Sequence, residues 1–362
     1  LKKKSDVKKL LVMGCFSERY GSDLVKEMPE VDKFFGTNDH SVVLSYLTGK
    51  KYKKEDPDYY RSILTPRHYA YLKIAEGCDN VCSFCSIPMM RGLQVSDTLE
   101  KNLLEAQRLV DSGVKELLLI AQDTTSYGWD LDRETNLHNL FDHLETIENL
   151  EWARLHYAHP AHLHRHMIER FRILDKLIPY IDMPVQHGSD SMLKLMRRGL
   201  KAGGIRNKID KLRDINPDIA IRTSIIVGHP GETEEEFQRL YDFVDEIKFD
   251  RLGVFTYSNE EGTYGYNAFK DEIPQQVKYD RMDAIMLLQQ DISLEKNNKL
   301  IGNTERVIID KYLDDQFSIG RTYRDSPDVD NTVIVDGQHP IGDFLDVKIT
   351  DATEYELQAS PL

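Results

Sequence analysis

Three cysteines that stand close together in the sequence suggest chemistry more strongly than any other feature of the chain. Cys78, Cys82 and Cys85 form a Cys-x-x-x-Cys-x-x-Cys pattern within the run from Glu76 to Cys85. A four-iron, four-sulfur cluster offers four iron corners to cysteine thiolates. Three cysteines on one loop hold three of these corners, so the fourth iron is open to another ligand. The spacing therefore predicts an iron-sulfur cluster with one reactive corner.

Zinc and a disulfide are the alternatives for these cysteines. Structural zinc takes four nitrogen or sulfur ligands, and no fourth cysteine or near histidine follows at the spacing of a zinc finger. The chain has 4 cysteines in 362 residues, three of them crowded into the predicted loop, which disfavours a disulfide framework. We therefore expect a reducing compartment, the cytoplasm, and no association with a membrane.

The cysteine pattern resembles that of the radical S-adenosylmethionine (SAM) superfamily, and Phe84 before the last cysteine matches an aromatic residue common there. In that superfamily the amino and carboxylate groups of SAM chelate the open iron. The resemblance implies that an electron from the cluster cleaves the sulfonium of SAM.

Hydrophobic periodicity predicts the frame that must position such a cluster. Six short apolar runs have the length and composition of buried parallel strands. They are Tyr69 to Ala75, Val114 to Ala121, Trp152 to Ala158, Ile178 to Val185, Ile219 to Gly228 and Phe249 to Tyr257.

Amphipathic stretches between these runs predict helices, the first of which ends near Gly113. The alternation indicates right-handed βα units and a parallel sheet, and six units favour a partial (β/α)6 barrel over a closed eightfold one. The predicted helices are Leu99 to Asp111, Leu137 to Leu150, His162 to Lys176, Ser189 to Arg198, Ile205 to Asn216 and Thr233 to Ile247.

Polar residues follow the second predicted strand, where an active site would collect at the carboxyl ends of the strands. Gln122, Asp123 and Thr124 stand there. We expect these residues to bind SAM, through its amino group or ribose. The alternative for Asp123, Thr124 and Thr125 is that they cap the next segment.

Arg222 lies inside the apolar fifth strand, where a charge needs a partner. It either forms a salt bridge with a neighbouring acid or binds a carboxylate of SAM or of the substrate. Ser224 faces the same side because side chains alternate along a strand. Gly228 and Gly231, after this strand, either form a tight turn or present amides to a bound nucleoside.

Five histidines between His156 and His166 invite a metal-site interpretation. The stretch contains Pro160 and begins a predicted surface helix. We therefore interpret these histidines as facing solvent rather than forming a designed site.

Different patterns flank the barrel and divide the chain into domains. Residues 1–50 contain two strand-like runs around a helical one and predict a truncated α/β domain, residues 51–66 read as a linker, and residues 67–297 form the barrel. After the helical stretch Val277 to Leu300, four strand-like runs predict a small antiparallel β-barrel over residues 298–362. These runs are Glu305 to Leu313, Phe317 to Tyr323, Thr332 to Val335 and Phe344 to Thr350.

This domain order resembles the radical SAM methylthiotransferases over essentially the whole chain, and the tail resembles their TRAM domain. Three stretches, from Leu119 to Gly128, Asp182 to His187 and Gly320 to Asp330, look most like the ribosomal branch of that family. The resemblance implies transfer of a methylthio group to the β-carbon of an aspartate in a small-subunit ribosomal protein, with an external electron donor.

The family uses a second four-iron cluster, held by three cysteines of its N-terminal domain. Cys15 matches the last of these, and the other two are absent from this sequence, which starts without a methionine. The resemblance therefore implies two clusters in the full-length protein and a chain that encodes only the first completely. Alternatively, Cys15 is a small buried hydrophobic residue.

Charge helps to choose between substrates, because relatives of the family modify adenosine in tRNA. The chain has 47 basic and 61 acidic residues, a net charge of −14, and residues 303–362 contain 13 acidic and 5 basic residues, a balance of −8. A surface that grips phosphates should be basic. The acidic tail instead suits a basic ribosomal protein and disfavours direct nucleic-acid binding. Three alternatives remain. The acidity only maintains solubility, the protein is a tRNA-modifying enzyme, or it is a noncatalytic scaffold that carries a cluster.

Overall fold

The computed structural model describes residues 7–52 and 62–362, and contacts divide the chain into two compact units. The first unit comprises the described residues of Leu1–Ser62 together with Glu76–Asn80 and Ser86–Gln94. The second comprises Ile63–Ala75, Val81–Cys85 and Val95–Leu362. The predicted linker, residues 51–66, lies mostly outside the described residues.

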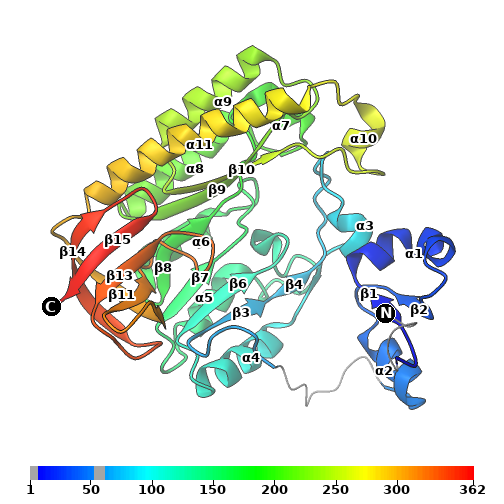
Figure 1. Ribbon diagram of the computed structural model, residues 1–362, viewed down its shortest axis with the longest axis horizontal. Helices are drawn as coiled ribbons and strands as arrows, with labels where there is room; N and C mark the ends of the chain where they lie inside the picture. The colour runs from blue at the N-terminus through cyan, green and yellow to red at the C-terminus, as the bar shows by residue number, and fades with distance from the viewer. Residues whose placement is uncertain (1–6, 53–61) are drawn as a thin grey trace. The chain divides into compact units, whose positions relative to one another are not determined.

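A six-stranded parallel sheet organises the second unit, and it confirms all six predicted strands (Figure 1). Its spatial order is β10-β9-β8-β7-β6-β3, so neighbours in the sequence are neighbours in the sheet, as in a barrel that does not close. The strands are β3 (Tyr69–Lys73), β6 (Glu116–Ile120), β7 (Trp152–Leu155), β8 (Leu177–Asp182), β9 (Ala220–Val227) and β10 (Arg251–Thr256).

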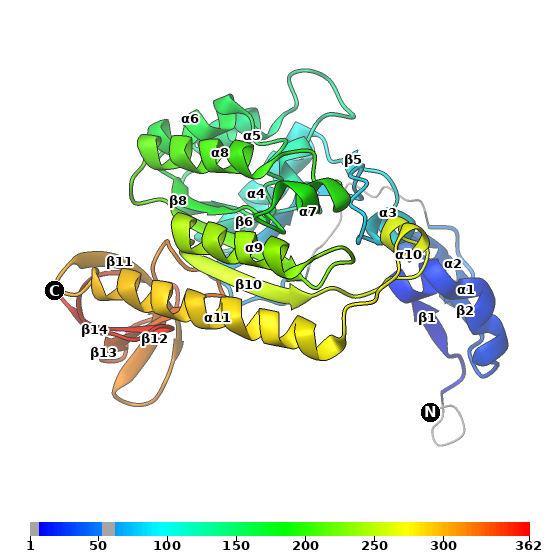
Figure 2. The same ribbon diagram turned by 90° about the horizontal axis from the view of Figure 1, so that it is seen from above.

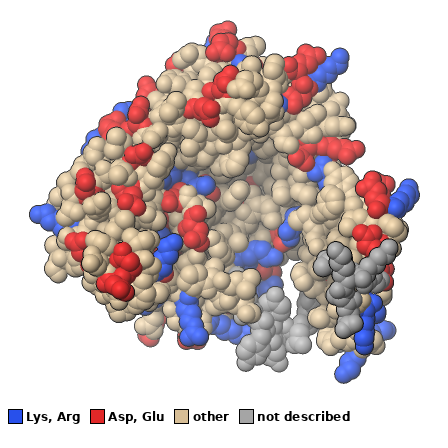
Figure 3. All heavy atoms as spheres, in the orientation of Figure 1, with Lys and Arg blue, Asp and Glu red and all other residues tan. Residues whose placement is uncertain are grey.

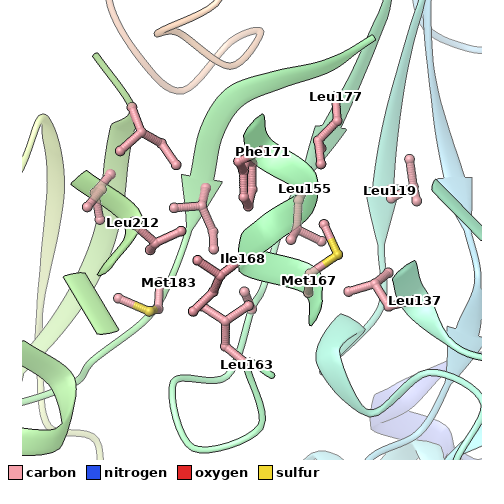
Figure 4. Close-up of a cluster of buried hydrophobic side chains, with 14 of the residues drawn as sticks. Leu119, Leu137, Leu155, Leu163, Met167, Ile168, Phe171, Leu177, Met183 and Leu212 are labelled. Atoms are coloured by element: carbon pink, nitrogen blue, oxygen red, sulfur yellow. The ribbon is translucent and has the colours of Figure 1, made fainter. Parts of the chain in front are cut away.

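Helices pack on the outer side of this curved sheet (Figure 2). They cover it with apolar side chains, and Figure 4 shows Met167, Ile168 and Phe171 of one helix pointing towards Leu155 and Leu177 of the strands. The helices on the sheet are α4 (Leu99–Asp111), α5 (Leu137–Leu144), α6 (Arg165–Ile173), α7 (Asp190–Leu195), α8 (Ala202–Ile215), α9 (Glu234–Ile247) and α11 (Gln275–Asn298). The 3-10 turn η1 (Thr124–Ser126) follows β6, and the short helix α10 (Tyr264–Ala268) follows β10 without contributing to this core.

A closed five-stranded barrel follows α11, in the order β11-β12-β13-β15-β14. The small barrel is confirmed, but β13 and β15 run parallel, so one pair departs from the predicted antiparallel arrangement. Its core is a separate cluster of valine, isoleucine and leucine side chains. The strands are β11 (Thr304–Tyr312), β12 (Phe317–Arg321), β13 (Thr332–Asp336), β14 (Phe344–Ala352) and β15 (Glu356–Pro361).

Charged side chains join the small barrel to the amino ends of the sheet strands. Glu116, the first residue of β6, receives a hydrogen bond from Arg154 at 2.8 Å and an ion pair from Arg321 of β12 at 2.5 Å. Arg251, the first residue of β10, donates to Asp325 at 2.8 Å. The small barrel therefore covers the amino ends of the strands. The predicted site lies at the opposite, carboxyl ends.

The first unit has a two-stranded parallel sheet, as the predicted strand, helix and strand require. Strand β1 (Leu11–Met13) pairs with β2 (Lys33–Phe35), and α1 (Cys15–Glu27) connects them. This unit also contains α2 (His40–Thr48) and α3 (Ile87–Arg91). The two-residue strands β4 (Ala75–Glu76) and β5 (Val95–Ser96) occur where the chain passes from one unit to the other.

Candidate active site

The segment of the cysteine loop that belongs to the second unit is fixed at the carboxyl ends of the strands. Ser83, between Cys82 and Cys85, is fully buried, and its hydroxyl lies 3.0 Å from Nε2 of His229, which follows β9. The Ser83 amide donates to the carbonyl of Met196 at 3.1 Å, and its carbonyl accepts from the amide of Gly265 at 2.6 Å. These bonds hold the loop segment that carries Cys82 and Cys85 in one conformation.

Cys78 belongs to the first unit and has its own supports there. Its amide donates to the carbonyl of Gly92 at 3.1 Å, and the side-chain amide of Asn80 donates to its sulfur at 3.3 Å. Cys78, Cys82 and Cys85 are free thiols in the structure, and no disulfide competes for them. Free cysteines that accept hydrogen bonds at sulfur fit the thiolate ligands that an iron-sulfur cluster requires.

Gly77 determines the path of the chain into Cys78. Its φ is +83°, and a Cβ at this position would lie 2.2 Å from the carbonyl oxygen of Leu93. Only glycine fits both the left-handed backbone and the close approach.

Replacing Gly77 with alanine is therefore expected to reduce cluster loading by more than half. Alanine at Gly49, whose φ is +71° with no atom within 4 Å of the new Cβ, supplies the same backbone strain without the collision. Iron and sulfide assays after anaerobic reconstitution measure the effect. Equal cluster loading in the two variants would contradict this prediction, because it would show that the loop accommodates a Cβ at position 77.

Asp123 and its neighbours after β6 do cap the following segment, as the capping interpretation predicts. The Asp123 carboxylate accepts from the amide of Thr125 at 3.0 Å and from its hydroxyl at 2.5 Å. The hydroxyl of Thr124 donates to the carbonyl of His156 at 2.6 Å. SAM binding by Gln122, Asp123 and Thr124 stays a prediction.

Arg222 has two acidic partners, which confirms the ion pair that the sequence left open. Its Nη1 donates to Asp182 at 3.1 Å and its Nε donates to Asp330 at 3.2 Å. Burial alone would lower the pKa of Arg222, but these carboxylates outweigh burial and raise it. Along β9, Arg222 and Ser224 alternate with buried residues, so both face one side of the strand. Contact of Arg222 and Ser224 with SAM stays a prediction.

The two glycines after β9 form a turn. Gly228 and Gly231 have φ values of +76° and +91°. The amide of Gly228 donates to the carboxylate of Glu232 at 2.8 Å, and Glu232 is held in turn by Arg281 at 2.9 Å. The structure therefore supports the turn interpretation of these glycines.

The interpretation of the histidines as facing solvent is wrong for two of the five. His156 and His159 are buried, because the loop after β7 folds over the strand ends before α6 begins at Arg165. Nδ1 of His162 lies 2.7 Å from the Asp123 carboxylate, and the ring of His159 stacks on that of His162 at 4.6 Å. Burial alone would raise the pKa of Asp123, but hydrogen bonds from His162 and Thr125 outweigh it and lower the pKa to about 2.

Asp123, His159 and His162 lie close enough to be considered as a metal site, since one ligand atom from each falls within 4.8 Å of the others. The amide of Ala161 donates to Nδ1 of His159 at 3.2 Å, so Nδ1 of the neutral ring is already used as an acceptor. Nε2 then carries the proton and has no lone pair to offer a metal. Burial and the charge of Arg198 lower the pKa of His159 to about 3, which keeps the ring neutral. The geometry favours a hydrogen bond between His162 and Asp123, with the ring of His159 stacked on that of His162.

Sequence reasoning missed Arg198 and the backbone strain of two residues at the strand ends. Tyr157, after β7, and Gln186, after β8, have φ values of +54° and +73°. Residues other than glycine rarely adopt such values, and those that do concentrate at functional sites. Arg198 donates to the sulfur of Cys82 at 3.2 Å. Its place at the end of a predicted helix gave no sign of that contact.

Comparison with known proteins agrees with this arrangement. The family model for the radical SAM superfamily matches residues 72–244, and that for the TRAM domain matches residues 301–362. The solved structure of OxsB, a cobalamin-dependent S-adenosylmethionine radical enzyme, covers 78% of this chain and 43% of its own chain, with a TM-score of 0.51 and 12% identity. That likeness supports the fold alone.

Two relatives are identical to this chain at nearly half of the aligned positions. The ribosomal protein uS12 methylthiotransferase RimO of Christiangramia forsetii is 47% identical over 100% of the chain and 80% of its own length. The enzyme of the same name from Flavobacterium johnsoniae is 48% identical over 99% of the chain and 82% of its own length. Since similarity of this extent shows the family, the chain belongs to the RimO family of radical SAM methylthiotransferases.

Proposed function

We propose that this protein adds a methylthio group to the β-carbon of an aspartate in ribosomal protein uS12. The observation that carries the proposal is the identity of 47% to a uS12 methylthiotransferase over the entire chain. The anchored cysteine loop at the carboxyl ends of the sheet strands is consistent with this activity.

Cys78, Cys82 and Cys85 would hold a four-iron cluster, which when bound supplies an electron to SAM. The chain's own residues provide position. Ser83 and His229 fix the loop, and Glu232 fixes the turn at Gly228. We assign SAM binding to Gln122, Asp123 and Thr124, which follow β6 at its carboxyl end, and to Arg222 and Ser224, which lie within β9.

A second cluster with Cys15 as one ligand is part of the proposal. Cys15 is the first residue of α1 and is half-buried. The chain has 4 cysteines, so once three serve the first cluster only Cys15 is left for the second. Its other ligands are not encoded in this sequence.

The charge of the C-terminal barrel supports a basic protein substrate, although less strongly than the sequence balance of −8 suggests. Several acidic residues counted there form internal pairs, such as Asp325 with Arg251. Within residues 303–362, six acidic and three basic side chains are exposed. On the face in Figure 3, no continuous basic patch covers this barrel. The exposed acids are Asp314, Asp315, Asp328, Asp336, Asp346 and Asp351, and the exposed bases are Arg306, Lys311 and Lys348.

The remaining expectations complete the proposal. We place the domains at residues 1–50, 67–297 and 298–362, with residues 51–66 as a linker, and infer a cytoplasmic protein that uses an external electron donor. In the described part of the chain, no helix is long and apolar enough to span a bilayer.

Mass spectrometry of uS12 and of total tRNA tests the proposed function. Both are incubated anaerobically with SAM, sulfide, a strong reductant and the enzyme in a form extended to the length of its relatives. A methylthio mass gain on one aspartate-containing peptide of uS12 is the expected result. A gain on adenosine instead would show that the substrate is tRNA.

The unextended chain provides a second measurement. It should cleave SAM reductively, because that step needs only the first cluster, and it should leave uS12 unmodified. If SAM binds but is not cleaved, or does not bind at all, the protein acts as a scaffold and the proposal fails.

A further inference from the structure

Arg198 is a buried arginine that contacts a predicted cluster ligand directly. It follows α7 and is 6% exposed. Its Nη1 donates to the sulfur of Cys82 at 3.2 Å, and its Nη2 donates to the carbonyl oxygen of Pro184 at 2.6 Å. Both contacts lie within the second unit. The bond to Pro184 fixes the guanidinium, so the bond to sulfur does not depend on a freely rotating side chain.

Among the residues that the structure describes, no acidic side chain forms an ion pair with Arg198. The described ion pairs include those of the buried Arg154, Arg251 and Arg321 but none of Arg198. Arginine stays protonated in proteins, and a buried cation without a counter-charge is costly. The Cys82 sulfur is the group in contact with Arg198 that can carry negative charge.

The charge of Arg198 also affects a neighbouring side chain. After burial, it is the largest influence that lowers the pKa of the nearby His159. Arg198 therefore places a positive charge near both His159 and the sulfur of Cys82.

We propose that Arg198 is a positioning residue that holds the Cys82 thiolate and raises the reduction potential of the first cluster. The inference rests on the proposed function for the presence of that cluster. Hydrogen bonds to ligand sulfurs are among the determinants of cluster potential, and a positive charge favours the reduced form, which carries one more negative charge. Arg198 thereby makes the first cluster easier to reduce before SAM is cleaved.

Arg197 offers a matched control because it is the adjacent residue and carries the same charge. It is exposed, and its guanidinium lies over the ring of Tyr264 at 3.4 Å from the centroid. Arg197→Met therefore removes one positive charge without removing a bond to sulfur. Arg198→Met removes both, and Arg198→Lys keeps the charge while losing the planar guanidinium that reaches two acceptors.

The experiment is a redox titration followed by electron paramagnetic resonance on the reconstituted chain and its three variants, with iron and sulfide assayed in parallel. At a fixed solution potential, Arg198→Met is expected to lower the ratio of reduced to oxidised cluster about tenfold, equivalent to about 59 mV for one electron. Arg198→Lys should show a smaller decrease, and Arg197→Met should stay within about twofold of the original chain.

Two results would overturn the inference. One is an unchanged ratio in Arg198→Met with full iron content, and the other is an equal decrease in Arg197→Met. If Arg198→Met does not retain iron, Arg198→Lys decides, and an unchanged ratio in that variant contradicts the proposal. Failure of the original chain to give a four-iron signal would instead count against the proposed function, so the two failures are distinguishable.

Discussion

Replacement of Glu116 by glutamine is expected to lower the free energy of unfolding of the second unit by about 3–5 kcal/mol, the usual cost of removing one partner from a buried charge network. Glu116 is fully buried, with Arg154 and Arg321 on its two carboxylate oxygens. Burial alone would raise the pKa of Glu116, but the two guanidinium groups outweigh it and hold the pKa below its ordinary value. Glutamine has nearly the same shape but removes the negative charge, so two buried cations lose their shared partner.

The loss should extend beyond the sheet because the network continues into the small barrel. Arg321 also pairs with Asp310 at 3.0 Å, and Asp310 lies 2.7 Å from Nε2 of His68. Denaturant unfolding followed by tryptophan fluorescence reports on this region, since Trp152 on β7 packs against Phe344 of β14 at 4.8 Å. We expect the midpoint of that transition to fall.

Glu235 provides the control for this prediction. It pairs with Arg239 at 2.7 Å across one turn of α9, and both side chains are exposed. Exposed pairs of this kind contribute little, so Glu235→Gln should leave the midpoint unchanged. A midpoint for Glu116→Gln as high as that of Glu235→Gln would mean that the guanidinium groups find other compensation.

The sheet and its outer helices could be predicted because each is specified by a pattern of apolar residues within its own stretch of sequence. Each strand is a predominantly apolar run, and α4 begins at Leu99 and ends at Asp111 as its apolar face and Gly113 indicate. The last strand, β15, was not predicted. Its sequence, Glu356–Pro361, contains one large apolar residue and ends in proline, and its place is determined by pairing with β13 and β14.

The site was predictable in its chemistry but not in its contacts. Cysteine spacing is readable along the chain, whereas the partner of Cys82 stands 116 residues away. His159 was misjudged for the same reason, because its burial arises from packing of the loop after β7 and not from a periodic pattern. Arg222 was recognisable as a charge that needs partners, but Asp330 comes from the small barrel, 108 residues later.

The second prediction with a large effect concerns the cluster itself. Replacement of Cys82 by alanine is expected to reduce bound iron from about four atoms per chain to below one and to reduce SAM cleavage at least about 100-fold, since one of three thiolate ligands is lost. Iron assay and quantification of 5′-deoxyadenosine measure the two effects. Circular dichroism confirms that the variant remains folded.

Cys15→Ala is the informative partner of this variant because it separates the two cluster assignments. Cys15 lies in the first unit at the start of α1, outside the three-cysteine loop. If it is a lone ligand whose companions are missing from this sequence, the variant should keep about four irons and full SAM cleavage. Loss of iron in Cys15→Ala comparable to that in Cys82→Ala would place Cys15 at the first cluster and contradict its assignment to the second. About eight irons in the unaltered chain would contradict the inference that this sequence lacks the other ligands of the second cluster, because residues besides its 4 cysteines would then have to hold that cluster.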